Sequence, residues 1–211
     1  MDKFIQNIAK QAGQIILEKF GQVKIQSTKS HALDIVTEAD LASNKFLCDA
    51  IKNKFPKHGI ISEETGEYQR NSEYIWIIDP LDGTINFSKK IPLFAVLIAL
   101  AKNNILQLAV IYDPVHNEMF FAKKSKGAYL NGKKIQCSEQ NNFLESLGCF
   151  TDRLKTERLK VLNNISQFVK GESFSVSSLS SIGLSSAYVA SSRRDWFISD
   201  GGKIWDYASK R

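Results

Sequence analysis

Three predicted strands in a row constrain the fold more than any other feature of this sequence. Apolar residues fill 94–101 and 105–112, and Asn103 and Asn104 between them suit the tight turn of a β-hairpin. Residues 118–122 add a third strand to the same meander, and Asn131-Gly132 marks another turn. Shorter apolar runs at 59–62 and 74–78 predict two further buried strands.

Helical periodicity surrounds these strands. Residues 3–20 place apolar side chains at helical spacing, and Gly21 follows as a stop signal. Thr37, with Asp40 three residues on, predicts a capping box for a second helix whose apolar positions run from Leu41 to Phe55. The pattern predicts layered α and β structure with antiparallel hairpins, an α+β fold, and not a regular βαβ alternation.

A polar stretch at 138–142 divides the chain. We expect an N-terminal α+β part at 1–138 and a C-terminal α/β part at 139–211. In the second part the pattern predicts helices at 155–169 and within the Ser-rich 172–192, a strand at 195–199 and a helix start at 205–208.

Composition narrows the class of protein. Of the 211 residues 43% are hydrophobic and 24% charged, which is ordinary globular usage. The longest apolar run, 93–101, is far short of the ~20 residues of a membrane helix, and the first helix carries charges that a signal peptide lacks. We therefore expect a cytoplasmic protein with no membrane partner.

Charge and cysteine usage exclude further classes of protein. The net charge is +6, but the Lys and Arg residues are scattered, so we expect general attraction for anions and no nucleic-acid partner. Three separated cysteines form no disulfide framework or structural zinc site, and we expect them to be buried hydrophobes in a reducing compartment: Cys48, Cys137 and Cys149.

The chemistry is concentrated where residues 77–87 leave a hydrophobic strand. Asp79 and Asp82 repel each other there, and a hard cation such as Mg²⁺ would neutralise them. Gly83 permits a close backbone approach, and Thr84 can open a helix whose N–H groups bind phosphate. Metal and phosphate together indicate phosphoryl chemistry. The alternative is an acidic turn that caps a helix.

Other acids lie at comparable places. Glu63 and Glu64 follow the strand at 59–62, Asp34 and Asp40 flank the start of the second helix, and Asp206 lies at a helix start. Each has an ordinary alternative, as a solvated pair, a cap, or a first-turn acid favoured by the helix dipole.

Taken together, these motifs resemble the inositol monophosphatase family, in the family's order and over essentially the whole chain. The carrying segments are Asp34-Ile-Val-Thr-Glu-Ala-Asp40, Ser62-Glu63-Glu64, residues 76–87 with Asp-Pro-Leu-Asp-Gly-Thr, residues 112–114 and 127–132, and Trp205-Asp206-Tyr-Ala208.

The resemblance implies an αβαβα sandwich and a Mg²⁺-dependent, lithium-sensitive phosphomonoesterase with two or three Mg²⁺ ions. It implies that one ion is held by Glu63, Asp79 and the Leu81 carbonyl, and a second by Asp79, Asp82 and Asp206. A weaker third position lies near Glu63 and Asp40. It also implies that Glu64 and Thr84 order the attacking water, that the Gly83 and Thr84 N–H groups bind phosphate, and that Lys29 lies at the rim.

The implied substrate is a small phosphate monoester, with inositol 1-phosphate first. Asn86 and Phe87 resemble the inositol branch, whereas 180–184 resembles the branch acting on 3′-phosphoadenosine 5′-phosphate. Ser199 or Asp200 lies where inositol-specific relatives carry a Glu, so fructose 1,6-bisphosphate also stays open. Such relatives are often homodimers.

Two rival hypotheses remain. Phosphatases of the haloacid-dehalogenase type also use an Asp-Gly-Thr turn, but one residue separates their two acids, whereas Pro80 and Leu81 intervene here. The second rival is an inactive, truncated relative. The family extends past the position of Arg211, so we expect missing C-terminal elements and exposed apolar surface.

Overall fold

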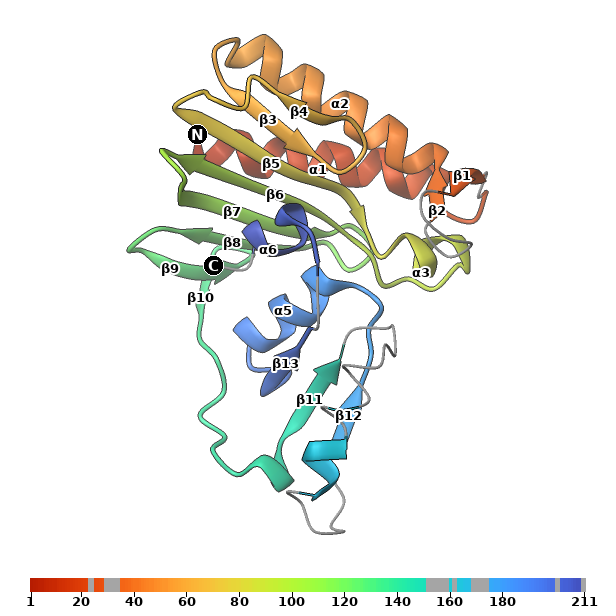
Figure 1. Cartoon of the computed structure of the whole chain (residues 1–211), viewed down its shortest axis with the longest axis vertical. Coiled ribbons are helices and arrows are strands. Elements are labelled where there is room, and N and C mark those ends of the chain that lie inside the picture. Colours follow the sequence, from red (N-terminus) through yellow and green to blue (C-terminus); the bar gives the residue numbers. More distant parts are fainter. Residues whose placement is uncertain are drawn as a thin grey trace.

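The computed structural model describes residues 1–22, 25–28, 35–150, 160, 163–167, 175–199 and 202–209. Its centre is an eight-stranded sheet in the order β10-β9-β8-β7-β6-β5-β3-β4 (Figure 1). β3 and β5 are parallel, and the other neighbours are antiparallel. The strands are β3 (Gly59–Ser62), β4 (Gly66–Tyr68), β5 (Tyr74–Asp82), β6 (Ala95–Lys102), β7 (Ile105–Asp113), β8 (Glu118–Lys123), β9 (Gly127–Leu130) and β10 (Lys133–Ile135).

The predicted meander is confirmed, including its turns. Asn103 and Asn104 have φ of 48° and 62°, the left-handed backbone that a two-residue hairpin turn requires. Asn131 and Gly132 do the same between β9 and β10, with φ of 48° and 80°. Asparagine tolerates this region better than most side chains, which is why the sequence signals both turns.

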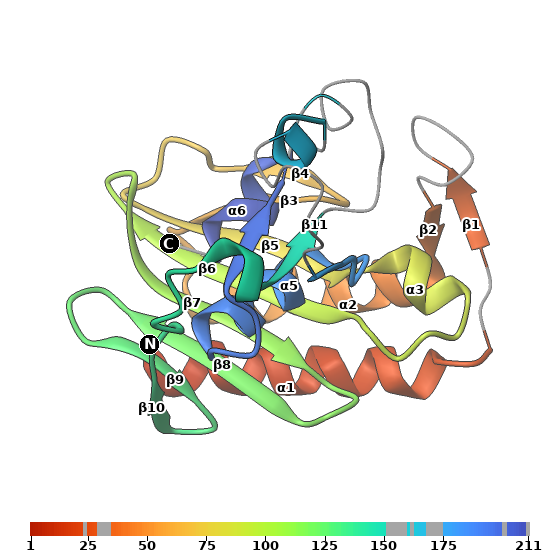
Figure 2. The same ribbon diagram turned by 90° about the horizontal axis from the view of Figure 1, so that it is seen from below.

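Two helices, α1 (Asp2–Lys19) and α2 (Glu38–Lys54), cover one face of this sheet. Figure 2 shows α1 lying along the strands. The predicted capping box at Thr37 is confirmed: its side chain accepts from the N–H groups of Ala39 and Asp40, and its own N–H donates to Asp40. Leu41 departs from the prediction. It is 44% exposed, because the inward face of α2 begins with polar residues.

The opposite face carries α5 (Ile182–Ala190) and α6 (Ile204–Ala208). Beyond α5 lies a second, parallel sheet in the order β12-β11-β13, formed by β11 (Leu147–Phe150), β12 (Ser175–Ser177) and β13 (Trp196–Ile198). One apolar cluster joins the layers, because Leu184 and Ala187 of α5 pack with Leu97 of the large sheet and Cys149 of the small one. The described layers are helix, sheet, helix and sheet, and the α+β sandwich is confirmed.

Some predicted boundaries differ from the structure. β5 does not end at Ile78 but continues through Pro80 to Asp82, so both aspartates belong to the strand. The pair β1 (Ile25–Thr28) and β2 (Ile35–Thr37) and the short elements α3 (Thr84–Ser88) and η1 (Phe143–Glu145) complete the description. Of the predicted helix at 155–169 only 160 and 163–167 are described, and these are helical.

The division at residue 138 stays a prediction. α5 and α6 come from the C-terminal part, yet both pack on the large sheet. Arg193 adds a polar tie, because its guanidinium donates two hydrogen bonds of 2.6 Å to Glu118 of β8.

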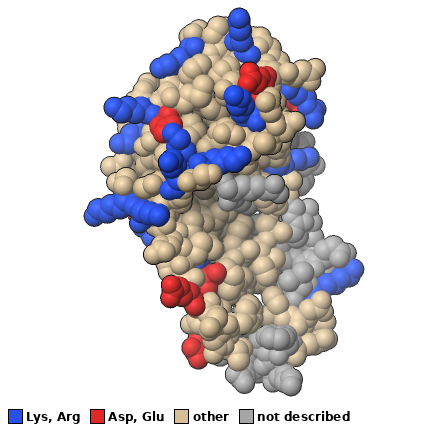
Figure 3. Space-filling view, turned by 90° about the vertical axis from the view of Figure 1, so that its left-hand side faces the viewer, with Lys and Arg blue, Asp and Glu red and all other residues tan. Residues whose placement is uncertain are grey.

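Hydropathy, surface charge and cysteine burial can be compared with the expectations from composition. Within the described residues, no helix is both long and apolar enough to cross a bilayer. On the face in Figure 3, basic side chains are spread over the upper part, with uncharged surface and some acidic side chains between them. Cys48 and Cys149 are buried as predicted, but Cys137 is exposed, because it follows the edge strand β10.

Gly13 allows α1 to approach β7, and we expect Gly13→Ala to destabilise the protein. Alanine is ordinarily better than glycine inside a helix by about 1 kcal/mol. A Cβ at Gly13, however, would lie 2.6 Å from Cε1 of Tyr112 and 3.0 Å from Cβ of Pro114. We expect this overpacking to dominate, with a net loss of about 1–2 kcal/mol in urea unfolding. Gln11→Ala, on the exposed face, should change stability by less than about 0.5 kcal/mol; a stabilised Gly13→Ala would contradict this packing.

Candidate metal and phosphate site

A bulge in β5 turns Asp79 and Asp82 to the same face of the sheet. Asp79 pairs with Leu97 and Asp82 with Ala95, so three steps along β5 match two steps along β6. In a regular strand, residues three apart point to opposite faces, and one extra residue reverses that alternation. A bulged residue is left unpaired in the ladder, so proline, which has no N–H to donate, is accepted there. Pro80 lies in this part of β5.

Glu63 lies at the same edge of the sheet because β3 runs parallel to β5. Ser62 pairs with Ile78, and the Glu63 N–H donates to the Ile78 carbonyl at 3.2 Å. The carboxyl ends of parallel strands meet at one edge, so Glu63 follows β3 where Asp79 follows Ile78. The structure thus brings together acids that are 16 positions apart in the sequence.

Asp206 reaches the same place from the C-terminal part. α6 packs on β5 and β6, with Ala208 buried beside Ile77 and Ala99. Asp206 is close enough to raise the pKa of both Asp79 and Asp82. Asp206 lies in the first turn of α6, and its carboxylate accepts a 2.5 Å hydrogen bond from the Lys203 N–H.

The buried acids resist ionisation. Asp79 is 2% and Asp82 7% exposed. Burial raises the pKa of Asp79 well above its ordinary value, and Glu63, Asp82 and Asp206 raise it further. Burial also raises the pKa of Asp82 to about 6, although hydrogen bonds from Ser181 and Gly183 oppose the change. Negative charge at this edge is therefore costly unless a cation balances it.

Asp40 and Thr84 meet in a neighbouring polar network. The Thr84 hydroxyl lies 3.2 Å from Oδ1 of Asp40 and 3.0 Å from the Leu81 carbonyl. Leu81 in turn donates its N–H to Oδ1 of Asp79 at 3.0 Å. Burial raises the pKa of Asp40 to about 7, despite hydrogen bonds from Thr37. Two acidic segments are thus linked through Thr84.

Gly83 is the residue that this turn requires. Its φ is 91°, and a Cβ there would lie 2.8 Å from the Leu93 carbonyl. The chain therefore turns into α3 at a position where other side chains are strained.

Sequence reasoning missed how Asp82 is held. Its carboxylate accepts hydrogen bonds from the Ser181 hydroxyl and from the N–H groups of Ile182 (3.1 Å) and Gly183 (2.8 Å). Asp82 therefore binds the first turn of α5, about 100 residues away. The Ser-rich stretch was a visible signal, but nothing in the sequence paired it with Asp82.

Other predicted residues are placed less directly. Glu64 is half-buried, and its N–H lies 3.4 Å from the Ser62 hydroxyl. Asn86 is buried and donates to the Leu93 and Leu179 carbonyls, so it ties two segments together. Ser199 lies 3.1 Å from the Tyr207 hydroxyl. Lys29, Asp34 and Asp200 lie outside the described residues.

The chemistry of the donor set fits a divalent metal ion. Among the described residues, no three acids, histidines or cysteines form a ready-made metal cage. Two of the acids, Asp82 and Asp206, are instead turned toward backbone N–H groups. Carboxylates and a carbonyl are the ligands that Mg²⁺ prefers, and the described Lys, Arg and His side chains make no ion pair with Asp79 or Asp82.

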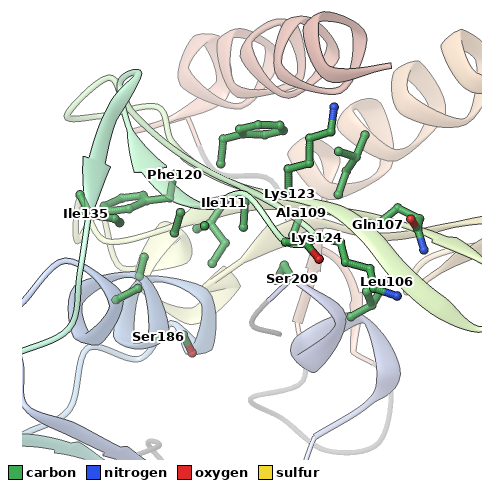
Figure 4. A pocket seen from close by; sticks show the side chains of 18 of the residues that line it. Leu106, Gln107, Ala109, Ile111, Phe120, Lys123, Lys124, Ile135, Ser186 and Ser209 are labelled. Atoms are coloured by element: carbon green, nitrogen blue, oxygen red, sulfur yellow. The ribbon is translucent and has the colours of Figure 1, made fainter.

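A separate cavity of about 650 Å³ lies between β7, β8 and α5, beside Ser209 (Figure 4). Its lining is mainly apolar, with Ile111, Phe120 and Ala187 among the contributors. None of the described residues that line it carries a carboxylate, so it is distinct from the acidic edge.

Similarity to known proteins identifies the family of this chain. The model of the inositol monophosphatase family matches residues 1–209. This chain belongs to the inositol monophosphatase family. It is a phosphoric monoester hydrolase by family. Inositol monophosphatase 1 of Solanum lycopersicum is 36% identical over 211 residues, covering 95% of this chain and 76% of that protein. Nus factor SuhB of Escherichia coli K12 is 33% identical over 205 residues, with the same coverage.

Solved structures of relatives have the same fold as this chain. The suhB protein of Bartonella henselae superposes with a TM-score of 0.91 at 30% identity, covering 99% of this chain and 81% of that one. An IMPase/NADP phosphatase complexed with Mg²⁺ and phosphate has a TM-score of 0.87 at 25% identity, covering 99% and 78%. The fold of the family is therefore shared along the described chain.

The buried acids predict an unusual pH dependence for the metal-free protein. Because folding raises their pKa values, the folded chain keeps protons that the unfolded chain has lost between about pH 4 and pH 7. Stability should therefore fall as the pH rises through that window, by roughly 1.4 kcal/mol per unit of pKa displacement. We expect urea unfolding in EDTA to give a smaller free energy at pH 8 than at pH 5.

Two variants test the cause. Asp79→Asn removes the central charge and should flatten this dependence. Asp49→Asn, an exposed partner of Lys45, should leave it unchanged. Equal pH dependence in Asp79→Asn and the wild type would contradict the assignment.

Proposed function

We propose that this chain hydrolyses inositol 1-phosphate in a Mg²⁺-dependent reaction. The observation that carries the proposal is the convergence of four acids at one sheet edge: Glu63, Asp79, Asp82 and Asp206. The charges of the other three raise the pKa of Asp79, and the charge of Asp206 also raises the pKa of Asp82. Family membership supplies the reaction class, and the Mg²⁺ and phosphate of the related IMPase/NADP phosphatase support the choice of ion.

In this proposal Glu63, Asp79 and the Leu81 carbonyl would hold one Mg²⁺, and Asp79, Asp82 and Asp206 would hold a second. A third, weaker position lies near Glu63 and Asp40. Bound there, Mg²⁺ would lower the pKa of a coordinated water and offset charge on the leaving oxygen. The burial of Asp79 and Asp82 favours a cation, because the cation removes the repulsion that burial intensifies.

The chain's own residues then position the reactants. Thr84 is held between Asp40 and the Leu81 carbonyl. Together with Glu64 it orients the attacking water. The N–H groups of Gly83 and Thr84 bind the phosphate oxygens, and Lys29 contributes charge at the rim. The water oxygen forms a bond to phosphorus, and the bond from phosphorus to the ester oxygen breaks. One proton of the water passes to the ester oxygen, which leaves as an alcohol, and the other stays on the phosphate.

The inositol assignment rests on the relatives and on local sequence. The tomato relative is named an inositol monophosphatase, and Asn86-Phe87 resembles that branch. Ser181 and Gly183 bind Asp82, which gives the Ser-rich stretch a role other than adenosine recognition. 3′-Phosphoadenosine 5′-phosphate and fructose 1,6-bisphosphate are the alternative substrates. The SuhB relative is named a Nus factor, but that likeness rests on the same residues and adds no separate site.

Two further parts of the proposal come from the resemblance and the composition. We place the protein in the cytoplasm as a homodimer with a small phosphorylated substrate as its partner. Light scattering on the purified protein tests the dimer, and a monomer at micromolar concentration would contradict it.

Removing one carboxylate tests the reaction. Asp79→Asn and Asp82→Asn should lower kcat/KM for inositol 1-phosphate by at least ~100-fold, because each takes part in holding the cation. Wild-type activity should require Mg²⁺ and fall when Li⁺ is added. Asp49→Asn, at an exposed position of α2 where the carboxylate pairs with Lys45, serves as the control. Turnover that survives in both site variants, or in EDTA, would contradict the proposal.

A substrate panel tests the specificity. We expect kcat/KM for inositol 1-phosphate to exceed the values for 3′-phosphoadenosine 5′-phosphate and fructose 1,6-bisphosphate, measured as phosphate release at equal Mg²⁺. A higher value for either alternative would replace the assigned substrate and leave the reaction class intact.

A further inference from the structure

The inward face of α2 carries three polar residues where a core helix ordinarily carries apolar ones. Asp40, Ser43 and Asn44 are 2%, 0% and 3% exposed. Their spacing of three and four residues places them on one stripe, which Leu47, Cys48 and Ile51 continue as buried apolar side chains. The polar end of this stripe faces the acidic edge of the sheet.

Together the three polar residues contact the two segments that bear the acids, 79–84 and 62–65. Asp40 accepts from Thr84, which follows the β5 bulge. The Ser43 hydroxyl donates to the Pro80 carbonyl at 3.0 Å, between Asp79 and Asp82. Asn44 contacts the turn that carries Glu63 and Glu64.

Asn44 holds that turn on both sides of the glutamates. Its Oδ1 accepts from the Ser62 hydroxyl at 2.5 Å, and its Nδ2 lies 3.4 Å from the Thr65 hydroxyl. The Ser62 hydroxyl also lies 3.4 Å from the Glu64 N–H. The Cys48 thiol, one helical turn on, lies 3.6 Å from Asn44 Oδ1 and 3.9 Å from the Thr65 hydroxyl. One amide therefore spans Ser62 to Thr65.

We propose that Asn44 is a positioning residue that, with Ser43 beside it, fixes the Glu63–Glu64 turn relative to Asp79 and Asp82. The inference rests on the proposed function, since it assigns these acids to a divalent cation. α2 is a rigid element of 17 residues packed on β5, so two adjacent side chains on it set the separation of two segments from different strands. Removing a residue that orients metal ligands ordinarily lowers metal affinity by about 10–100-fold, and we expect the same loss here.

The energetic logic favours positioning over simple burial. A buried amide or hydroxyl costs free energy unless it is hydrogen-bonded, and an apolar residue would fill the same stripe without that cost. Here the cost is met by contacts to the segments that bear the acids. Three buried polar groups that all contact these two segments are explained by a common task.

The test measures Mg²⁺ binding directly, by calorimetric titration of the substrate-free protein with MgCl₂. Asn44→Ala should raise the Kd for Mg²⁺ by about 10-fold or more. Ser62→Ala should do the same, and the double variant should add little, because both substitutions break one connected network. Ile51→Val, a buried substitution on the same helix outside the network, should lower the melting temperature and leave the Kd unchanged.

The outcomes are separable. If Asn44→Ala lowers the melting temperature but binds Mg²⁺ as the wild type does, the residue is structural only and the inference is overturned. If Asn44→Ala does not fold, Ser62→Ala and Thr65→Val each remove one hydroxyl, and an unchanged Kd in both overturns it equally. A wild-type chain that neither binds Mg²⁺ nor hydrolyses inositol 1-phosphate overturns the proposed function and this inference with it.

Discussion

Electrostatic repulsion at the end of β5 is the constraint on which the rest of the structure depends. Two aspartates are buried on the same face of a strand, and two further acids lie within electrostatic range. A fold tolerates such a cluster only if protons, hydrogen bonds or a cation balance it. The surrounding elements supply the hydrogen bonds, through the Leu81 N–H to Asp79 and the first turn of α5 to Asp82.

This constraint accounts for the arrangement of the layers around the site. α2 on one face and α5 and α6 on the other meet the large sheet where β5 bulges. α2 contributes Ser43 and Asn44, α5 contributes backbone donors, and α6 contributes Asp206. The helices therefore do more than cover apolar surface, because each brings polar groups to the same edge.

The sequence predicted the local elements better than the contacts between them. Turn chemistry identified the hairpins at Asn103-Asn104 and Asn131-Gly132, and the capping box identified the start of α2, because such signals depend on neighbouring residues only. The extension of β5 to Asp82 was missed, since Pro80 usually argues against a strand interior and a bulge depends on the partner strand. The acids were recognised from family motifs, but the bond from Ser181 to Asp82 joins positions 99 residues apart and no local pattern reports it. Asn44 had a weak signal, as a polar residue in the stripe that Leu47 and Ile51 continue.

The most direct test of the central claim is a crystal structure of this chain soaked in Mn²⁺, with anomalous difference density used to locate the ion. We expect two peaks, one bounded by oxygen atoms of Glu63, Asp79 and the Leu81 carbonyl, and one bounded by those of Asp79, Asp82 and Asp206. Asp206 would then be turned away from the Lys203 N–H. Density only at other sites, or Asp79 and Asp82 without a bound ion at saturating Mn²⁺, would contradict this claim.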